Sequence, residues 1–537
     1  MKKPIKILSL VLAVGLLAAC SGNNPTSKKP SGDDDSGFSF NDTELNTAQE
    51  IHDANQKRYL NLGIQYYNIT EANLQSCNVD GRSNKSAPKQ VEVKWDFDAN
   101  GETVTNYSFT YGQKEDLSDG YTFDVGTTPS AKFYNPYIGD NYFKVTATLD
   151  DGSTVESPVK IFKVETEAPR NIYAGNMPNV RDMGGRTTYA GGKIKQGLIY
   201  RGAGNRFDNS SQVNSECTDV LRNVLKIKTE INVANGDGNN INLGGSVQLQ
   251  NCYMDYGATP YSNLARNAER IRQVMDILAD ETNYPVFYHC RIGTDRTGIT
   301  GMMIGGLLGI PFNEVFQDYC FSNFAPIDGL RYPNKPSDPN GDDPAKYIDE
   351  ILAMPGATYQ EQTYNALLSI GCKAEKLNKI IDFMTEGEKA ELGVKGAVKT
   401  ADQLTSDGTK KTSTDYKNPA TYYECGSGKK ASMTATFTAG EKDVVIYLGS
   451  TDSSQSSKFA DKITLKIDGT QKTIANTKTM HQAGFGTTGQ NSRTGYMFNM
   501  LGKFDLTAGE HTIEVSVKSG TFNIGTIAAF DHITPSK

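Results

Sequence analysis

The segment from Val286 to Ile310 constrains the fold most. Its first residues, Val286-Phe287-Tyr288, are typical of a buried strand, and Ile299 to Ile310 is typical of an apolar helix. The residues between them, 289–298, read HCRIGTDRTG. A strand that enters a helix through a tight loop directs the loop amides and the positive end of the helix toward one anion. This order of elements predicts an α/β domain with the strand inside its sheet.

Cys290 and Arg296 carry the chemistry of this loop. The field of the amides and of the helix favours the thiolate form of a cysteine at its centre, so we expect Cys290 to be a nucleophile. Arg296 can return across the loop and bind two phosphate oxygens at once. Gly293 supplies the backbone freedom that such a turn needs. The loop therefore predicts nucleophilic chemistry on a phosphate group.

Residues 289–298 match the HCxxGxxR(T/S) signature and resemble the protein tyrosine phosphatase superfamily. The GxDRTG ending is most similar to the bacterial tyrosine phosphatase family, which includes dual protein and lipid phosphatases. Upstream, Asn179 to Gly185 resembles the NxRDxGG opening of that family, and Gly197 to Arg201 resembles its GxxyR strand. Downstream, Leu307 to Ile310 and the pair Asp318-Tyr319 also fit.

The resemblance implies a cysteinyl-phosphate mechanism without a metal or cofactor. Cys290 would attack phosphorus while Arg296 stabilises the charge on the equatorial oxygens. Thr297 would hydrogen-bond the departing thiolate, and His289 would order the loop backbone. The remaining loop residues would bind the phosphoryl group through their amides: Arg291, Ile292, Gly293 and Thr294.

Two carboxyl groups qualify as the general acid. Asp295 lies inside the loop, as in the GxDR-type relatives, and is favoured. Asp255 lies 35 residues before Cys290, a spacing like that of the mobile-loop aspartate of dual-specificity phosphatases. Nearby, Arg181 and Asp182 are expected to support the site through an ion pair.

The loop composition bears on the substrate. Lipid-active relatives usually carry Lys before the loop Asp, where this chain has Thr294, and Arg291 restores one charge elsewhere. A protein phosphorylated on tyrosine, or on serine or threonine, is the leading substrate, and a small phosphoester, an inositol phosphate or a phosphoinositide is the alternative. A further alternative is a catalytically silent surface protein that binds glycans.

The first twenty residues are typical of a targeting signal. Lys2, Lys3 and Lys6 precede an apolar run that is too short for a stable membrane span. The run ends Leu17-Ala18-Ala19-Cys20, which resembles the lipobox of bacterial lipoproteins. The resemblance implies that residues 1–20 are a signal segment with Cys20 as the lipidated residue, and it predicts a lipid-anchored protein of the outer membrane or cell surface. Residues 21–37 contain no large apolar side chain, so they cannot form a core and are predicted to be a tether.

The rest of the chain predicts a multidomain protein around a central α/β cysteine-phosphatase domain at 170–386. Residues 38–87 form a lead-in, and the alternating pattern of 88–165 predicts a β-sandwich that resembles immunoglobulin-like or fibronectin type III modules. Residues 387–420 are expected to be a linker. Residues 421–537 predict a jelly-roll sandwich that resembles galactose-binding-like carbohydrate modules, with a glycan as a partner and four candidate contact residues, Tyr422, Tyr423, Tyr447 and Tyr496.

Charge and cysteine content exclude other classes. The chain has 62 acidic and 55 basic side chains, a net charge of −7, which argues against nucleic acid as a partner. Its 8 cysteines in 537 residues are too sparse for a disulfide scaffold, although a pair between Cys217 and Cys252 is conceivable. An exposed, reactive Cys290 is expected to be prone to oxidation outside the cytoplasm.

Overall fold

The computed structural model describes residues 36–530 apart from a set of gaps: 208–211, 235, 255–263, 265–266, 334–350, 353, 355–357, 391, 393–395, 413–420, 438–440, 453–458 and 475–496. The signal segment with Cys20, the tether up to residue 35, and Asp255 lie outside the described residues. The chain forms two compact units. The first comprises Val93–Ala131 and Tyr142–Ile161 with the residues up to Leu45, and the second comprises Asn46–Glu92, Lys132–Asn141 and the residues from Phe162 onward.

The strands near the N-terminus are antiparallel, as their alternating pattern predicts. One sheet has the order β5-β4-β7-β8, with β9 also paired to β7. The expected turn at Asp150-Asp151-Gly152 joins β7 to β8, and Gly152 adopts a φ of +82° there. The elements of this region are β1 (Phe38–Ser39), α1 (Asp42–Asn46), β2 (Val91–Lys94), β3 (Asp96–Phe97), β4 (Val104–Gly112), β5 (Tyr121–Gly126), β6 (Ser130–Phe133), β7 (Gly139–Leu149), β8 (Thr154–Glu156) and β9 (Lys160–Val164).

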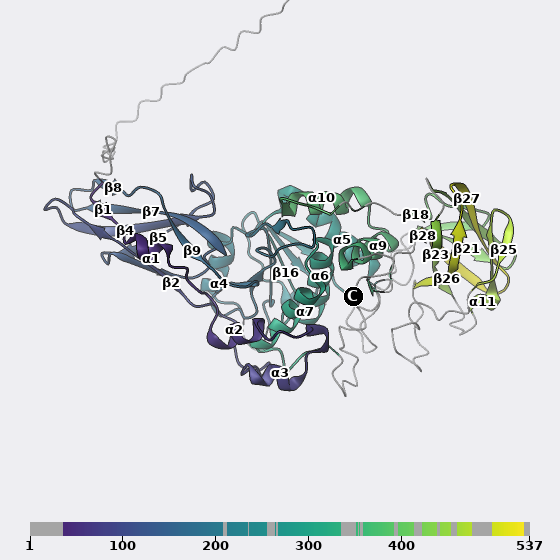
Figure 1. Ribbon diagram of the computed structural model, residues 1–537, viewed down its shortest axis with the longest axis horizontal. Coiled ribbons are helices and arrows are strands. Elements are labelled where there is room, and N and C mark those ends of the chain that lie inside the picture. Colours follow the sequence, from purple (N-terminus) through teal and green to yellow (C-terminus); the bar gives the residue numbers. More distant parts are fainter. Residues whose placement is uncertain are drawn as a thin grey trace, which may run out of the picture. The chain divides into compact units, whose positions relative to one another are not determined.

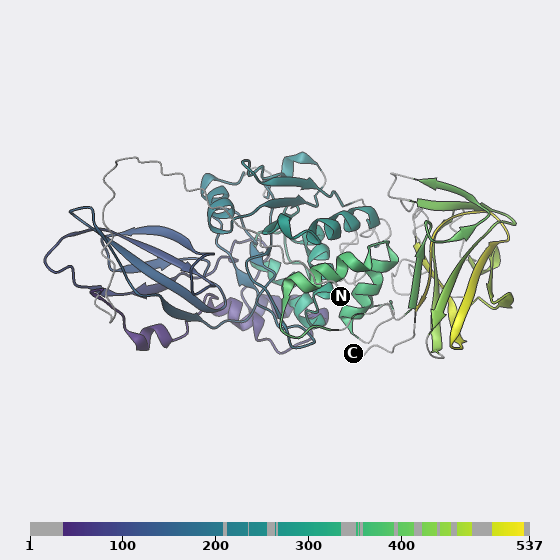
Figure 2. The ribbon, with the colours of Figure 1, turned by 90° about the horizontal axis from the view of Figure 1, so that it is seen from above.

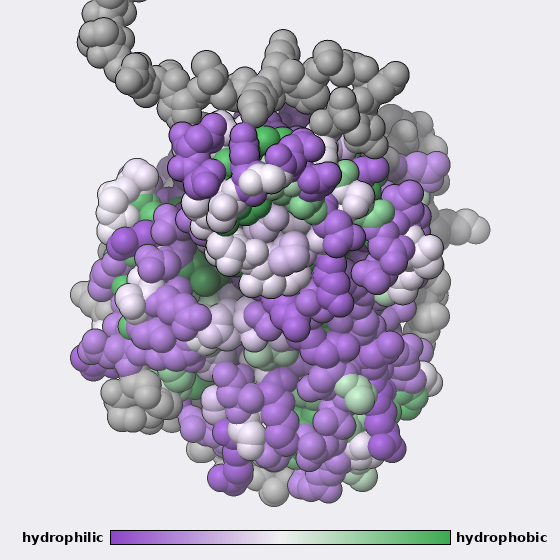
Figure 3. All heavy atoms as spheres, turned by 90° about the vertical axis from the view of Figure 1, so that its left-hand side faces the viewer, coloured by the Kyte–Doolittle hydropathy of each residue, from purple (hydrophilic) through white to green (hydrophobic). Residues whose placement is uncertain are grey.

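Aromatic side chains fill the core of the first unit. Trp95, Phe109 and Phe143 are buried, and the ring of Phe109 stacks on the rings of the other two at 6.1 and 5.3 Å between centroids. Buried and partly exposed residues alternate along β7. One face of the sheet therefore contributes to this core, while the other face is more exposed to solvent. The surface seen in Figure 3 is mainly hydrophilic, with hydrophobic residues in small separate groups.

The second unit is built on a six-stranded sheet with the order β10-β11-β13-β16-β14-β15 (Figure 1). The last four strands in that order are parallel, and β10 and β11 run antiparallel at one side. The strand-like runs of the sequence at 227–233, 248–254 and 285–289 each contain one of these strands. The bounds are β10 (Arg170–Asn171), β11 (Arg181–Asp182), β13 (Ile199–Gly202), β14 (Thr229–Asn232), β15 (Gln248–Asn251) and β16 (Val286–His289).

Helices cover this sheet because their apolar positions recur at helical spacing. Helix α5 (Ala268–Leu278) is amphipathic and buries Ile271, Val274 and Met275. Helix α6 packs on β13 and β16, and α10 packs on α5 (Figure 1). The other elements here are α4 (Ser215–Asp219), α6 (Asp295–Leu307), α7 (Phe312–Phe321), α9 (Tyr359–Ser369) and α10 (Ala374–Met384), with β12 (Lys193–Ile194) paired to β17 (Thr385–Glu386).

The lead-in belongs to the second unit from Asn46 onward. It contains α2 (Ala54–Leu60) and α3 (Glu71–Ser76), each begun by a capping box, and it docks on α7. The hydroxyl of Tyr59 donates a hydrogen bond of 2.8 Å to the carbonyl of Gln317, whose side-chain amide donates in turn to the carbonyl of Leu60 at 3.0 Å. The amide of Tyr66 donates to Asn313 at 2.6 Å. This stretch, which the sequence left without assigned structure, therefore forms one wall of the α/β domain.

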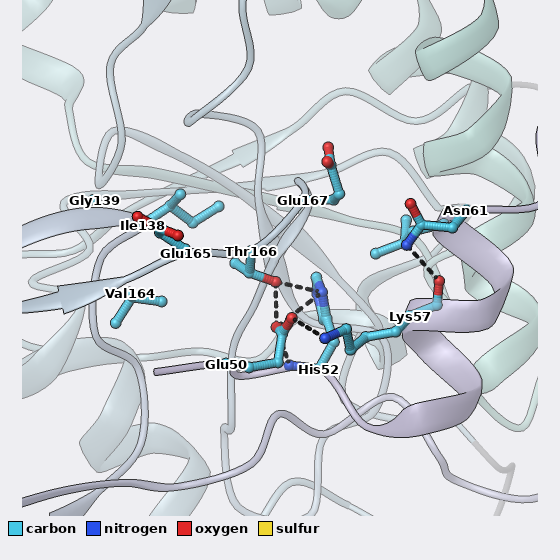
Figure 4. A pocket seen from close by; sticks show the side chains of 11 residues that line it. Glu50, His52, Lys57, Asn61, Ile138, Gly139, Val164, Glu165, Thr166 and Glu167 are labelled. Carbon is cyan, nitrogen blue, oxygen red and sulfur yellow. Dashed lines mark hydrogen bonds and ion pairs between the residues drawn. The ribbon is translucent and has the colours of Figure 1, made fainter. Parts of the chain in front are cut away.

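A hollow of about 460 Å³ lies beside the segment that leads into β10 (Figure 4). Residues 50–61, 138–139 and 164–167 contribute to its lining. The Thr166 hydroxyl contacts Glu50 at 2.5 Å and the buried His52 ring at 2.7 Å, and Glu50 pairs with Lys57 at 3.3 Å. Burial lowers the pKa of His52. These contacts fix the position of the segment that precedes β10.

The C-terminal residues form two sheets, which Figure 2 shows as facing layers. One has the order β20-β21-β28-β23-β26, with β18 also paired to β28, and the other has the order β19-β22-β27-β24-β25. The strands are β18 (Gly396–Thr400), β19 (Thr405–Ser406), β20 (Thr409–Thr412), β21 (Thr421–Gly426), β22 (Lys430–Phe437), β23 (Glu441–Asp452), β24 (Ile463–Ile467), β25 (Thr470–Lys472), β26 (Met497–Leu506), β27 (Gly509–Val517) and β28 (Thr521–Phe530), and α11 spans Phe459–Lys462.

The expectation of a linker at 387–420 is wrong for residues 396–412, which contain three strands. Strands β18, β19 and β20 lie in it and pair with β28, β22 and β21. The four residues of β20 are all exposed, so its Lys and Thr side chains are solvated on both faces of the strand. The sequence of β20 therefore lacks the alternation of apolar and polar residues that identifies a strand. Of the tyrosines proposed for glycan contact, Tyr422 is buried and Tyr496 lies outside the described residues.

No cysteine among the described residues is in a disulfide, so the conceivable pair of Cys217 and Cys252 is not formed. The two side chains belong to different apolar clusters of the second unit. Burial raises the pKa of each thiol to about 12, which makes both unreactive near neutral pH. Of the helices that the structure describes, none is both long and apolar enough to cross a bilayer.

Candidate active site

Cys290 lies at the carboxyl end of an interior strand. Strand β16 pairs in parallel with β13 on one side and β14 on the other, and its four residues are all buried. Helix α6 begins at Asp295, with Thr294 at its N-cap position. The predicted strand, loop and helix are thus confirmed, and the loop opens where parallel sheets of α/β proteins commonly bind ligands.

The carbonyls of four consecutive loop residues, 290–293, accept hydrogen bonds from groups outside this four-residue stretch. Nδ1 of His289 contacts the carbonyl of Cys290 at 3.1 Å, and the amide of Gly204 donates to the carbonyl of Arg291 at 2.9 Å. When the carbonyls of a short loop are all bound on its outer side, the amides face the inner side. The loop is therefore held in the form that binds an anion.

Asn179 and Arg201 bind the other two carbonyls. Nδ2 of Asn179 donates to the carbonyls of Ile292 and Gly293 at 3.2 and 3.0 Å, and Nη2 of Arg201 donates to Gly293 at 3.0 Å. Both residues come from the upstream motifs that the sequence singled out. Their role is to fix the loop from behind, which for Arg201 agrees with the structural role expected.

Gly293 is required by two features of the backbone. Its φ is +74°, a conformation that residues with a side chain rarely adopt, and a Cβ there would lie 2.5 Å from the carbonyl oxygen of Gly202. The loop can approach β13 this closely only with glycine at this position. The sequence-based expectation for Gly293 is confirmed.

Asp318 on α7 holds three buried arginines behind the loop. Its carboxylate pairs with Arg181 and Arg186 at 2.9 Å and with Arg201 at 2.6 Å. Burial alone would raise the pKa of Asp318, but the three guanidinium groups outweigh it and hold the pKa well below its usual range. The cluster carries an excess of positive charge close to the anion loop.

The expected pair of Arg181 with Asp182 is wrong. The two residues are adjacent on strand β11, so their side chains point to opposite faces of the sheet. Asp182 pairs instead with Arg170 at 2.8 Å, and both side chains are buried. The sequence contained no signal for Arg170 or Arg186, because each meets its partner only through the folded sheet.

His289 links the loop to strand β14. Its Nε2 lies 3.0 Å from the Glu230 carboxylate, while Nδ1 faces the carbonyl of Cys290. The ring therefore joins a loop carbonyl oxygen to a carboxylate of the neighbouring strand. Burial alone would raise the pKa of Glu230, but the hydrogen bond and charge of His289 outweigh it and keep the pKa low. This geometry agrees with a loop-ordering histidine.

Cys290 is only 1% exposed, so the expectation of an exposed thiol is wrong. The residue belongs to the apolar core cluster of the second unit, because it follows the buried strand directly. Arg296 is half-buried on the first turn of α6. The hydroxyl of Thr297 is fully buried and has no hydrogen-bond partner within the described part of the chain. A donor in that state fits the role that the family resemblance implies for Thr297.

Asp295, the favoured general acid, is buried and faces a guanidinium. Its Oδ1 lies 3.5 Å from Nε of Arg331, which comes from the segment after α7. The rival carboxyl group, Asp255, lies outside the described residues. The sequence did not identify Arg331, because only the folded chain brings it to the loop.

The side chains of Ile292 and Thr294 pack away from the inner side of the loop. Ile292 is buried in a small cluster with Ala325 and Ile327, and Thr294 is buried with its hydroxyl 3.4 Å from Asn179. These two residues therefore offer an anion only their backbone. Within the described residues, no group of three or more His, Cys, Asp or Glu side chains is placed to hold a metal ion.

Residues 235–361 match the sequence model of the tyrosine phosphatase family. The core catalytic domain of the PP-IP phosphatase Siw14 from S. cerevisiae is similar at 17% identity, over 32% of this chain and 88% of that domain, with a TM-score of 0.21. A GH26-CBM35 β-(1,4)-mannanase from Podospora anserina is similar at 13% identity, over 26% of this chain and 29% of its own, with a TM-score of 0.19. These identities and TM-scores are too low to assign an activity.

No curated protein matches the chain significantly. The matched segment includes β16, the loop and α6, and it extends past Arg331. The loop signature and the family match agree on the same residues. The chain therefore contains a segment that matches the tyrosine phosphatase family model, and the loop from Cys290 to Arg296 lies inside that segment.

Proposed function

We propose that the protein is a cysteine-dependent phosphomonoesterase whose leading substrates are proteins phosphorylated on tyrosine, or on serine or threonine. The observation that carries the proposal is the set of loop carbonyls at 290–293, which are all bound from outside so that the amides face inward. The positive end of α6 and the three arginines on Asp318 add to the field at the same place.

In this mechanism Sγ of Cys290 attacks phosphorus in line with the leaving oxygen. The P–O bond breaks, and Asp295 gives its proton to that oxygen. Arg296 and the loop amides bind the equatorial oxygens as charge develops on them. Water then attacks the cysteinyl-phosphate, which releases inorganic phosphate, and Thr297 donates a hydrogen bond to the regenerated thiolate.

The test is hydrolysis of p-nitrophenyl phosphate by the full chain in the presence of EDTA. We expect turnover that vanadate blocks and that falls at least about 1,000-fold in Cys290→Ser, because the hydroxyl is a far weaker nucleophile. Cys425→Ser makes the same chemical change at another buried cysteine, in the C-terminal sheets, and serves as the matched control. Equal activity of Cys290→Ser and the wild type would reject the proposal.

An inositol phosphate or phosphoinositide is a second candidate substrate, since Arg291 adds a positive charge next to Cys290. Comparing kcat/KM for phosphotyrosine peptides and for phytate separates the two. A silent glycan-binding protein would instead bind a glycan array and hydrolyse no phosphoester.

We also propose that Cys20 carries a lipid that anchors the protein to the outer membrane or cell surface. The lipobox-like residues 17–20 support this. Cys20→Ala should release the protein from the membrane fraction, and unchanged fractionation would reject the anchor.

A further inference from the structure

The segment from Ala325 to Arg331 lies along the anion loop and pairs with its charges. Nη2 of Arg291 donates a hydrogen bond of 2.8 Å to Oδ2 of Asp328, and Arg331 faces Asp295 at 3.5 Å. Between these two pairs, Ala325 and Ile327 pack on Ile292. We call residues 325–331 the clasp.

The clasp is fixed in its middle and at its last residue by neutral hydrogen bonds. The side-chain amide of the buried Asn323 donates to the carbonyl of Arg331 and accepts from its amide, both at 2.6 Å. The amides of Ile327 and Gly329 both donate to the carbonyl of Gly81, at 2.9 and 3.0 Å. These bonds do not involve the side chain of Asp328, so the clasp keeps its place when that side chain changes.

The pair of Arg291 and Asp328 is exposed to water. The side chain of Arg291 is 31% exposed and that of Asp328 is 63% exposed. An ion pair in such a position contributes at most about 1 kcal/mol, so a competing anion can break it. In the free protein Asp328 is a charged partner of Arg291 at 2.8 Å.

Arg291 directly follows Cys290, so its guanidinium extends from the loop that holds the reacting phosphoryl group. An anionic group elsewhere on the substrate, within reach of Arg291, must compete with the carboxylate of Asp328. A substrate with a single phosphoryl group and no further anionic group does not enter this competition. The charge of residue 328 therefore affects the binding of substrates that carry a second anionic group, and it does not affect the binding of substrates with a single phosphoryl group.

We propose that Asp328 is a specificity-determining residue, which pairs with Arg291 and so disfavours substrates that carry a second anionic group beside the reacting phosphate. The inference rests on the proposed phosphomonoesterase function. It assigns the discrimination to a residue outside the HCxxGxxR motif, on the clasp rather than in the loop.

The test compares kcat/KM for phytate and for p-nitrophenyl phosphate in the full chain. Asp328→Asn suits it, because Asp328 has a φ of +63° and Asn tolerates that conformation at least as well. We expect kcat/KM for phytate, divided by kcat/KM for p-nitrophenyl phosphate, to rise on the order of 3- to 5-fold. The rise should come from a lower KM for phytate, and it corresponds to about 1 kcal/mol. The kcat/KM for p-nitrophenyl phosphate should stay within about 2-fold of the wild-type value, because substitutions of single surface charges usually have effects of this size or smaller.

Two further variants make the result specific. Asp276→Asn removes an equal charge from the exposed pair of Asp276 with Lys376 on α5 and α10 and should leave the ratio unchanged. In Arg291→Gln the added Asp328→Asn change should have no effect, because the guanidinium that it releases is absent. An unchanged ratio in Asp328→Asn, or an equal rise in the Arg291→Gln background, would overturn the inference. If the wild type hydrolyses neither substrate, the proposed function itself fails.

Discussion

Oδ2 of Asp318 accepts a hydrogen bond of 2.6 Å from Nη1 of Arg201, whose Nη2 donates to the carbonyl of Gly293. A single buried carboxylate thus orients the guanidinium that holds the back of the anion loop. Because Asp318 also pairs with Arg181 and Arg186, it connects strand β11 to the loop as well.

Asp318→Asn should destabilise the protein strongly. The substitution leaves three buried guanidinium groups without their counter-ion, and breaking a buried pair in this way costs about 3–5 kcal/mol. Urea unfolding monitored by fluorescence would measure the loss. Asp382→Asn, at an exposed pair with Lys389, should cost less than about 1 kcal/mol. Similar costs for the two variants would contradict the role assigned to Asp318.

Arg331→Gln should move the alkaline limb of the pH profile. The limb falls where the general acid loses its proton, and a nearby positive charge favours the ionised carboxyl group. Without that charge the ionised form of Asp295 loses a stabilising partner, so the alkaline limb of kcat/KM should shift to higher pH. Arg331→Lys keeps the charge and should shift the limb less.

Arg270→Gln, at an exposed pair with Glu269, is the matched control and should leave the profile unchanged. A profile of Arg331→Gln that overlays the wild type would show that Asp295 is not the proton donor. The carboxyl group of Asp255 would then be tested by Asp255→Asn.

Gly293→Ala should abolish most of the activity. An added Cβ would lie 2.5 Å from the carbonyl oxygen of Gly202 and would stand at a φ of +74°. The loop must shift to relieve the contact, and misplacing a catalytic group by about 1 Å costs on the order of 100-fold in rate. Gly152→Ala has a similar φ of +82° but open space around its Cβ, so it should lower stability by about 1 kcal/mol without changing kcat. Full activity in Gly293→Ala would contradict this packing.

His511 should make the C-terminal sheets more stable at acidic pH. Its hydrogen bond with Asp468, at 2.7 Å, raises the pKa of His511 in the folded protein. The stabilisation is complete below the unfolded pKa of about 6.5 and is lost as the pH rises through the raised folded pKa. His511→Gln should therefore lower Tm more at pH 6 than at pH 8.5. The difference in the free energy of unfolding should be at most about 1 kcal/mol, because Asp468 is half exposed.

Glu424→Gln, at the exposed pair with Lys411, provides the control for the histidine variant. Its effect on Tm should be the same at both pH values, since neither partner titrates in that range. A pH-independent effect of His511→Gln would show that the imidazole does not titrate with folding.

Local patterns in the sequence predicted the elements that carry the chemistry. Helix α5 follows from the spacing of its apolar residues, and the loop after β16 follows from the order of a buried strand, a short polar stretch and an apolar helix. Gly293 could be identified because its role depends on backbone conformation. These features are encoded within a few neighbouring residues.

Long-range pairs could not be read from the sequence. Asp295 meets Arg331, and Asp182 meets Arg170 rather than its neighbour Arg181, only after the strands and the clasp have packed. Strand β20 escaped prediction for another reason: its side chains are exposed on both faces, so no apolar alternation marks it. Most differences between the sequence-based predictions and the structure therefore have two causes. Either the contacting residues are far apart in the sequence, or the element is exposed to solvent on both faces.

The docking of the lead-in on α7 decides how the α/β domain can be excised for study. An expression fragment that begins at residue 170 would lack Tyr59 and Leu60, and would leave the aromatic rings of Phe321 and Phe324 in contact with water instead. Such a fragment is expected to aggregate. A usable truncation has to begin upstream of Asn46.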